Sequence, residues 1–424
     1  MNLEKLKTTL ALLGLTIVVL TTVDLLGRAA WGIDQRFFDP PVVDLDSGAQ
    51  DERQFSAAYD LAGYDVTQLF REFHATERIV YEPYIIWDRR FYRGELINID
   101  IEGFRKTTNN SEADDVMSVW MFGGSTMWGE GAPDDETIPS YLSEMLNAWG
   151  VDTVVKNLGE RGFVSTQELV FLYRELQAGR RPDVVVFYDG INDTAAASNW
   201  PELPGSHVSR GRIRDRFEFG EVPSEERREL VQSLGIYKAS RILLDRLDAR
   251  GTKTRFQSDD EEVNTQPKFL DANFEFLGNQ AVRIWLANHE LVSALANEFG
   301  FTFTFVLQPS LWTEGKPLHP SEKRILAEEF DSRAMTHIMA TRAEMSSIVE
   351  ERLRNGSLPP NVYNLANVFD KAEGPLYIDY VHTAGPGNRI VGKALYDVLV
   401  GQICQEPPRN VTNEIGHQIE AACE

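Results

Sequence analysis

The sequence DVVVFYDGIND, residues 183–193, joins a short apolar run to a polar turn. After its first residue, the segment 183–188 is apolar throughout, which is typical of a strand in a parallel sheet that is covered on both faces. Gly, Asn and Asp residues follow this strand, and the active sites of such sheets lie outside the carboxyl ends of the strands. This stretch therefore predicts an α/β fold built on a parallel sheet.

Strand-like and helix-like segments alternate along most of the chain. The expected strands are residues 116–122, 151–158, 183–188, 301–307 and 362–366. The expected helices are residues 138–149, 166–176, 279–299, 325–354 and 387–403. Repeated strand–helix units predict a three-layer α/β/α fold with a five-stranded parallel sheet.

The same pattern suggests how the chain is divided. The α/β domain is expected over residues 111–405, after a leader and linker over residues 28–110 and before a C-terminal tail over residues 406–424. Residues 195–270 are rich in charge, Pro and Gly and are expected to form an insertion over the carboxyl edge of the sheet. An aromatic cluster within residues 81–92 of the leader is expected to pack against the edge of the domain.

Composition excludes several classes of protein. The chain has 424 residues, of which 42% are hydrophobic and 25% charged, a balance typical of a folded globular protein. The formal net charge of −23 argues against nucleic-acid binding, which needs clustered Lys and Arg. The sequence contains no HExxH, P-loop or GxGxxG motif, so we expect neither a metal nor an organic cofactor. It does not indicate an oligomeric state.

The N-terminus predicts a membrane anchor. Residues 8–23 carry no charge, and a helix of about 20 residues would rise about 30 Å, the thickness of a bilayer core. Lys5 and Lys7 precede this run and favour a cytoplasmic N-terminus. Residues 1–27 are thus expected to be a cytoplasmic tip and a transmembrane signal anchor, with a periplasmic or extracellular catalytic domain. Two alternatives are a signal peptide cleaved near residues 29–30, giving a secreted protein, and a buried helix of a soluble protein.

The chain has two cysteines, Cys404 and Cys423. An extracytoplasmic compartment would allow them to form a disulfide. Two unpaired thiols near the C-terminus are the alternative.

Two motifs carry the residue types of a nucleophile and a general base. Ser125 lies in FGGST, residues 122–126, directly after the first expected strand, where glycines allow a tight turn that exposes a serine. His382 lies in DYVH, residues 379–382, where Asp379 is three positions away and can hold the imidazole.

Two further turns supply possible hydrogen-bond donors for an oxyanion. NLGERG, residues 157–162, follows the second expected strand, and either of its glycines could offer a backbone N–H. DGIND, residues 189–193, follows the third and contains Asn192, whose side-chain amide is a neutral donor. Each of these blocks alone is weak evidence. Together, and in this order along the chain, they supply the nucleophile, the oxyanion donors, the general base and the carboxylate that orients the base, which are the roles that a serine hydrolase needs.

Together, these blocks resemble the SGNH/GDSL hydrolase superfamily, over about two thirds of the chain. The resemblance implies Ser125 as nucleophile, Asp379 and His382 as its partners, and an oxyanion hole formed by Ser125, Gly162 and Asn192. It selects Gly162 over Gly159, because the family places this amide five residues after the Asn of the block, before a segment with Ser/Thr-Gln. The first block reads GGST rather than GDS, a variant of exported and membrane-anchored members.

The expected activity is therefore a serine-dependent ester hydrolase, an esterase or deacetylase acting outside the cytoplasm on a small-molecule or glycan ester. One alternative is an O-acyltransferase that modifies an exported polysaccharide through the same acyl-serine. Its carbohydrate cleft could be lined by Trp128, Trp200 or Trp312, although core or rim packing is the commoner role of such residues. A catalytically inactive, anchored binding protein is the second alternative. As base, His382 would lose its active form below about pH 6.

Overall fold

The computed structural model describes residues 51–77, 79–211, 213–214, 273–312, 315–329 and 333–424. The described residues from Glu52 onward belong to one compact unit. The predicted membrane anchor, residues 1–27, and residues 215–270 of the predicted insertion lie outside the described residues. Within the ranges above, no helix has both the length and the apolar character needed to cross a membrane.

Five parallel strands form the central sheet, as the sequence predicted. In chain order they are β5 (Met117–Gly123), β6 (Thr153–Asn157), β7 (Val184–Asp189), β8 (Thr302–Leu307) and β9 (Val362–Asn364). The order across the sheet is β6-β5-β7-β8-β9, and every neighbouring pair is parallel. The carboxyl ends of β6, β5 and β7, which lead into the NLGERG, FGGST and DGIND motifs, therefore lie side by side.

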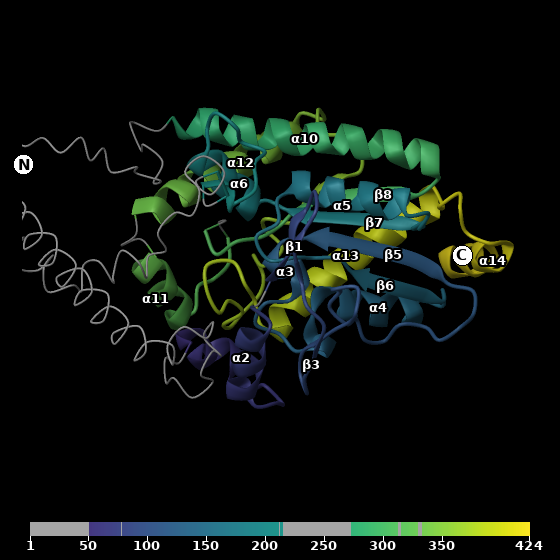
Figure 1. Ribbon diagram of the computed structural model, residues 1–424, viewed down its shortest axis with the longest axis horizontal. Helices are drawn as coiled ribbons and strands as arrows, with labels where there is room; N and C mark the ends of the chain where they lie inside the picture. Colours follow the sequence, from purple (N-terminus) through teal and green to yellow (C-terminus); the bar gives the residue numbers. More distant parts are fainter. Residues whose placement is uncertain (1–50, 78, 212, 215–272, 313–314, 330–332) are drawn as a thin grey trace, which may run out of the picture. The chain divides into compact units, whose positions relative to one another are not determined.

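Helices cover both faces of this sheet (Figure 1). One face carries α5 (Ser165–Gln177), α6 (Ile191–Asn199), α10 (Phe274–Phe299) and α12 (Arg333–Arg354). The other face carries α4 (Ile138–Ala148) and α13 (Gly385–Gln405), which pack against each other. The predicted three-layer α/β/α arrangement is confirmed.

The central strands contribute to two hydrophobic cores at once. In β7, Val185 and Phe187 join the core on the α10 side, and Val184 and Val186 join the core on the α13 side. Successive side chains of a strand point to opposite faces. A strand covered on both sides therefore needs an apolar run without alternation, which is the pattern of residues 184–188.

One helix prediction needs correction. The single helix expected over residues 325–354 corresponds to two helices, α11 (Pro320–Glu329) and α12. α11 begins at a proline, whose fixed φ suits the first turn of a helix. Apolar spacing does not begin until Ile325, so the pattern missed this first turn. Residues 330–332, between the two helices, lie outside the described residues.

The described part of the leader forms short elements within the same compact unit as the sheet. These are η1 (Glu52–Phe55), η2 (Ala57–Tyr59), α2 (Val66–Ala75), β1 (Ile79–Glu82), β2 (Ile86–Arg89), β3 (Tyr92–Arg93) and β4 (Asn98–Ile99). β1 pairs antiparallel with β2, and β3 with β4. Within the aromatic cluster, Trp87 is buried, whereas Tyr81 and Tyr84 are exposed.

Arg105 joins the leader segment to the loop that follows β5. Its Nε lies 3.0 Å from Oδ1 of Asp134, and its other nitrogens donate to the carbonyl oxygens of Gly129 at 2.9 Å and Ala132 at 2.7 Å. The guanidinium also lies 4.4 Å from the ring centroid of Trp128. A buried cation needs such partners, because it has lost its water.

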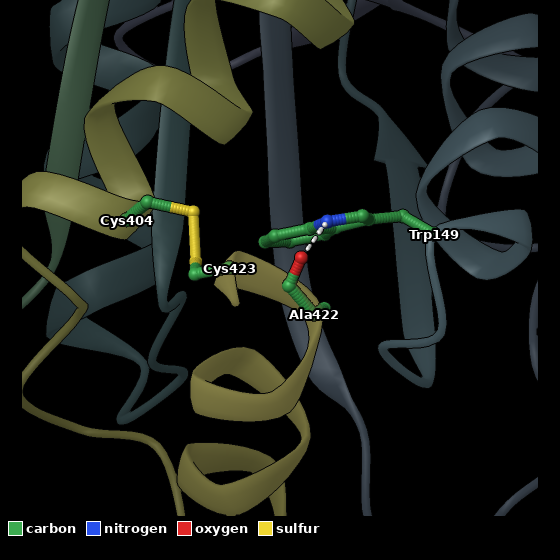
Figure 2. The surroundings of a disulfide bond; sticks show 4 residues. All are labelled: Trp149, Cys404, Ala422 and Cys423. Carbon is green, nitrogen blue, oxygen red and sulfur yellow. Dashed lines mark hydrogen bonds between the residues drawn. A yellow bond between two sulfur atoms is a disulfide. The ribbon is translucent and has the colours of Figure 1, made fainter.

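The C-terminal residues are part of the fold. Cys404 and Cys423 form a disulfide, with a Cα–Cα distance of 5.6 Å, that joins the last turn of α13 to α14 (Asn413–Cys423). Beside it, Nε1 of Trp149 donates a hydrogen bond to the Ala422 carbonyl oxygen at 3.0 Å (Figure 2). Two isoleucines of α14 are buried in the core on the α13 side. The pairing that the sequence left open is thus present.

Replacing both cysteines, Cys404→Ser with Cys423→Ser, is expected to lower the free energy of unfolding by about 3 kcal/mol. The bridge restricts the unfolded chain between residues separated by 19 positions. The measurement is urea denaturation of both proteins without reductant, and wild-type protein treated with dithiothreitol should match the double variant. Equal midpoints for the variant and the oxidised wild type would contradict a stabilising bridge.

Candidate active site

Ser125 is the first residue of the short helix α3 (Ser125–Trp128), immediately beyond β5. The turn before it is crowded. A Cβ at Gly123 would lie 2.9 Å from the Tyr188 carbonyl oxygen, and a Cβ at Gly124 would collide with Nδ2 of Asn192. Two glycines are therefore required to bring Ser125 to the end of the strand. As the first helical residue, Ser125 has a backbone N–H that the helix itself cannot satisfy.

Ser125, His382 and Asp379 form a continuous chain of polar contacts. The Ser125 Oγ lies 2.7 Å from Nε2 of His382, and Nδ1 of His382 lies 2.7 Å from Oδ2 of Asp379. The other Asp379 oxygen accepts the backbone N–H groups of Val381 at 2.9 Å and His382 at 2.8 Å. The structure thus brings together three predicted site residues that lie as many as 257 positions apart.

Asn192 lies in the first turn of α6, against the same glycine turn. Its Nδ2 donates to the Phe163 carbonyl oxygen at 2.8 Å and lies beside the space that a Gly124 side chain would fill. Phe163 follows Gly162, which has a φ of +78°. The NLGERG and DGIND motifs therefore meet next to Ser125.

The two glycines of NLGERG, Gly159 and Gly162, differ in their surroundings. The Gly159 N–H already donates to Oδ1 of Asn157 at 3.0 Å, and a Cβ there would collide with the backbone of Met127 and Trp128. Gly159 therefore serves packing. Among the described residues, the Gly162 N–H has no hydrogen-bond acceptor and is the one available to a ligand.

Glu130 is a neighbour of the site that the sequence analysis missed. Its Oε2 lies 3.6 Å from Nε2 of His382. The Glu130 carboxylate forms salt bridges with two arginines, Arg53 at 2.6 Å and Arg161 at 2.7 Å. Arg53 also lies 3.2 Å from Oδ2 of Asp379. In the sequence, Glu130 is only an acidic residue five positions after Ser125 and between two glycines, and the fold shows that it is buried and that both glycines have a positive φ.

These charges control ionisation at the site. Burial alone would lower the pKa of His382, but the carboxylates of Asp379 and Glu130 outweigh it and raise that pKa above the ordinary 6.5. Burial alone would raise the pKa of Asp379, yet the charge and hydrogen bond of His382 and the charge of Arg53 hold it well below its usual value. Neighbouring positive charges likewise lower the pKa of Glu130. Both carboxylates are therefore ionised at neutral pH.

A second group of buried carboxyls lies at the end of β7. Burial raises the pKa of Glu168, Asp189 and Asp193, in the last case to about 6. Asp189 accepts from Nε1 of Trp285 at 3.0 Å, and Asp193 accepts from the Ser165 hydroxyl at 2.6 Å. Because burial favours the protonated form of each carboxyl, this group carries less than its formal negative charge. Among the described residues, no group of three or more His, Cys, Asp or Glu side chains could hold a metal ion.

The three tryptophans considered for a carbohydrate cleft have different positions. Trp128 is fully buried against Arg105, so it is a core residue. Trp312 stacks on Tyr380 of the DYVH motif, with ring centroids 5.1 Å apart. Trp200 lies under Arg210, whose guanidinium carbon is 4.8 Å from the ring centroid.

Comparison with known proteins gives no family model and no curated protein that matches this chain. Among solved structures, a lipolytic protein of the G-D-S-L family from Veillonella parvula DSM 2008 is 10% identical with a TM-score of 0.32, over 67% of this chain and 98% of that one. An acetyl xylan esterase from Geobacillus stearothermophilus is 14% identical with a TM-score of 0.30, over 69% and 97%. An alpha/beta hydrolase enzyme from the metagenome of Lake Arreo, Spain, is 15% identical with a TM-score of 0.30, over 68% and 95%. The function is therefore inferred from the motifs and the site geometry rather than from these distant similarities.

The raised pKa of His382 predicts a pH profile that differs from that of a free histidine. The reactive form of Ser125 needs neutral His382, so labelling by a fluorophosphonate should become half-maximal above pH 6.5. In Glu130→Gln, the loss of a negative charge beside Nε2 should move this midpoint to lower pH. Labelling rates between pH 4 and 9, read by mass, provide the measurement.

The matched control is Glu77→Gln, because Glu77 carries the same charge as Glu130, is half exposed, and lies 3.8 Å from Arg161 and 3.2 Å from Nδ1 of His74. Its midpoint should equal that of the wild type. A wild-type profile that stays flat down to pH 4 would count against His382 as the base.

Proposed function

We propose that this protein is a serine-dependent ester hydrolase. The observation that carries the proposal is the chain of contacts from Ser125 through His382 to Asp379, each link 2.7 Å long, at the carboxyl edge of the parallel sheet. An Asp that is held ionised and fixes one imidazole nitrogen leaves the other nitrogen free to accept the serine proton.

In the first half of the reaction, Nε2 of His382 takes the Ser125 hydroxyl proton as Oγ attacks the ester carbonyl carbon. The oxyanion is stabilised by the N–H groups of Ser125 and Gly162 and by the side-chain amide of Asn192. His382 then gives its proton to the leaving alcohol, and an acyl-serine remains. In the second half, water attacks the acyl carbon as His382 takes its proton. The bond between the acyl carbon and Oγ then breaks, His382 returns the proton to Oγ of Ser125, and the acid is released.

We propose membership of the SGNH/GDSL superfamily on the same basis. The GGST, GERG, GIND and DYVH blocks occur in the family order, and the first three lie at the carboxyl ends of β5, β6 and β7. The side-chain amide of Asn192 and the available N–H of Gly162 support their assignment to the oxyanion hole.

Hydrolysis is preferred over acyl transfer to a sugar. An O-acyltransferase would use the same acyl-serine and replace water by a sugar hydroxyl, so the triad geometry is equally compatible with it. Of the tryptophans that could form a carbohydrate cleft, Trp128 belongs to the core. An inactive binding protein would have no need of the ionised Asp379 beside His382.

We also propose an extracytoplasmic setting with an N-terminal membrane anchor. The uncharged run over residues 8–23 behind Lys5 and Lys7 supports the anchor. The Cys404–Cys423 disulfide supports an oxidising compartment, since such bonds are rare in the cytosol.

Replacing the nucleophile provides the main test. Ser125→Ala is expected to lower kcat for p-nitrophenyl acetate at least about 1000-fold and to abolish fluorophosphonate labelling, because no other group replaces Oγ. Ser293→Ala, which changes a serine on α10, should retain both activities.

Two outcomes would change the conclusion. Labelling of Ser125 with little turnover, followed by acylation of an added oligosaccharide, would identify an acyltransferase. A well-folded wild type with neither labelling nor turnover would contradict the enzymatic proposal.

The anchor has its own test. The full chain is expected to remain with membranes after alkaline carbonate washing and to keep its N-terminus by intact mass. The paired change Val18→Arg with Val19→Arg should release it, because each charge at a helix centre costs about 3 kcal/mol on insertion. Leucine at both positions is the matched control. A soluble product lacking about 30 residues would instead identify a cleaved signal peptide.

A further inference from the structure

The Gly162 amide belongs to a peptide that is held by a residue outside the sheet. The peptide bond between Arg161 and Gly162 carries both the Arg161 carbonyl oxygen and the Gly162 N–H. Nε1 of Trp87, on β2, donates a hydrogen bond to that carbonyl oxygen at 3.1 Å, although the two residues are 74 positions apart. A trans peptide holds its C=O and N–H on opposite sides. The indole bond therefore fixes the direction of the Gly162 N–H.

The same strand holds the preceding residue of the turn. The guanidinium of Arg89 binds Oε1 of Glu160 through Nε at 2.8 Å and a second nitrogen at 2.7 Å. Both side chains are buried, and the same Glu160 oxygen accepts the Arg161 backbone N–H at 2.8 Å. Consecutive peptides of the turn are thus fixed by β2.

The opposite side of the turn faces the proposed nucleophile. The Phe163 carbonyl oxygen accepts the hydrogen bond from Asn192, and a Cβ at Gly124 would lie 3.6 Å from that oxygen. The turn over residues 160–163 therefore lies between β2 and the Gly124–Ser125 backbone.

Packing holds the indole of Trp87 in place, whereas Gly162 has no side chain that could hold its peptide. Trp87 is buried, and its ring packs edge-on against Phe163, with centroids 5.5 Å apart, and against His207 at 5.9 Å. Gly162, with a φ of +78°, has no side chain to restrict rotation of its peptide. The Phe163 N–H closes this turn on the Glu160 carbonyl oxygen at 3.1 Å, and the hydrogen bond from Trp87 acts on the Arg161–Gly162 peptide within the turn.

We propose that Trp87 is a positioning residue for the oxyanion hole. Its indole N–H orients the Arg161–Gly162 peptide so that the Gly162 N–H faces the oxyanion, and the bond to the carbonyl also polarises the amide and strengthens it as a donor. The inference rests on the proposed esterase function. It means that a residue of the leader segment contributes to catalysis by orienting the Gly162 N–H.

The test uses Trp87→Phe in the full chain, which keeps an aromatic ring and removes the N–H. The matched control is Trp149→Phe, because Trp149 also donates its indole N–H to a backbone carbonyl oxygen, at 3.0 Å, next to the disulfide (Figure 2). Each variant is assayed with p-nitrophenyl acetate and with its thionoester, whose sulfur is a poor hydrogen-bond acceptor.

Trp87→Phe is expected to lower kcat for the oxygen ester about tenfold, with little change in KM and a much smaller effect on the thionoester. The pH midpoint should not move, because the triad is intact. Trp149→Phe should leave both substrates unaffected. Equal losses for the two esters, or no loss, would overturn the proposal, since general damage does not distinguish oxygen from sulfur.

Hydrogen exchange separates this inference from the proposed function. The peptide covering residues 158–165 should exchange faster in Trp87→Phe and at the wild-type rate in Trp149→Phe, whether or not the protein is an esterase. A wild type without Ser125-dependent turnover would remove the esterase proposal. Unchanged exchange in Trp87→Phe would remove the positioning role of Trp87.

Discussion

The candidate site depends on a stretch of backbone that has no room for side chains. At the end of β5, Gly123 approaches the Tyr188 carbonyl oxygen at the end of β7, and Gly124 approaches the amide of Asn192. Because only hydrogen atoms fit there, Ser125 can begin its helix within reach of both neighbouring strand ends. A single methyl group at this point would push β5 away from β7 and separate the serine from the donors on which the proposed chemistry relies.

The hydrophobic pattern predicted the sheet because its central strands are covered on both sides. That requirement leaves a signal that local sequence can carry, and it is clearest in β5, β7 and β8, whereas the edge strands β6 and β9 were predicted from short β-rich runs. Ser125, Asn192 and the Asp379–His382 pair were recognisable for a related reason. Each lies in a turn directly after a strand or in a short motif of its own, and the order of these turns along the chain follows from the topology.

Other parts of the site left no such signal. Arg53 reaches Asp379 from 326 positions away, and Trp87 reaches the Arg161 carbonyl oxygen across 74 positions. Both residues lie in a segment of short elements with little periodicity, where the aromatic cluster predicted packing against the edge of the domain but no pattern identified a partner for either residue. Glu130 is close to Ser125 in the chain, but its proximity to His382 follows from a turn between two glycines that only the folded backbone reveals. The positions of Arg53, Trp87 and Glu130 therefore depend on tertiary contacts rather than on local sequence preferences.

Two buried ion pairs limit how far this chain can be shortened from its N-terminal side. They join residues 52–110 to the loops that follow the sheet strands. Arg89 binds Glu160, Arg105 binds Asp134, and all four side chains are buried. A fragment that starts at residue 111 would keep both carboxylates and lose both guanidiniums. Breaking a buried pair costs about 3–5 kcal/mol, and two such losses approach the entire stability of a typical domain, about 5–15 kcal/mol. The smallest autonomous fragment must therefore begin upstream of Arg89, well before the first strand of the sheet.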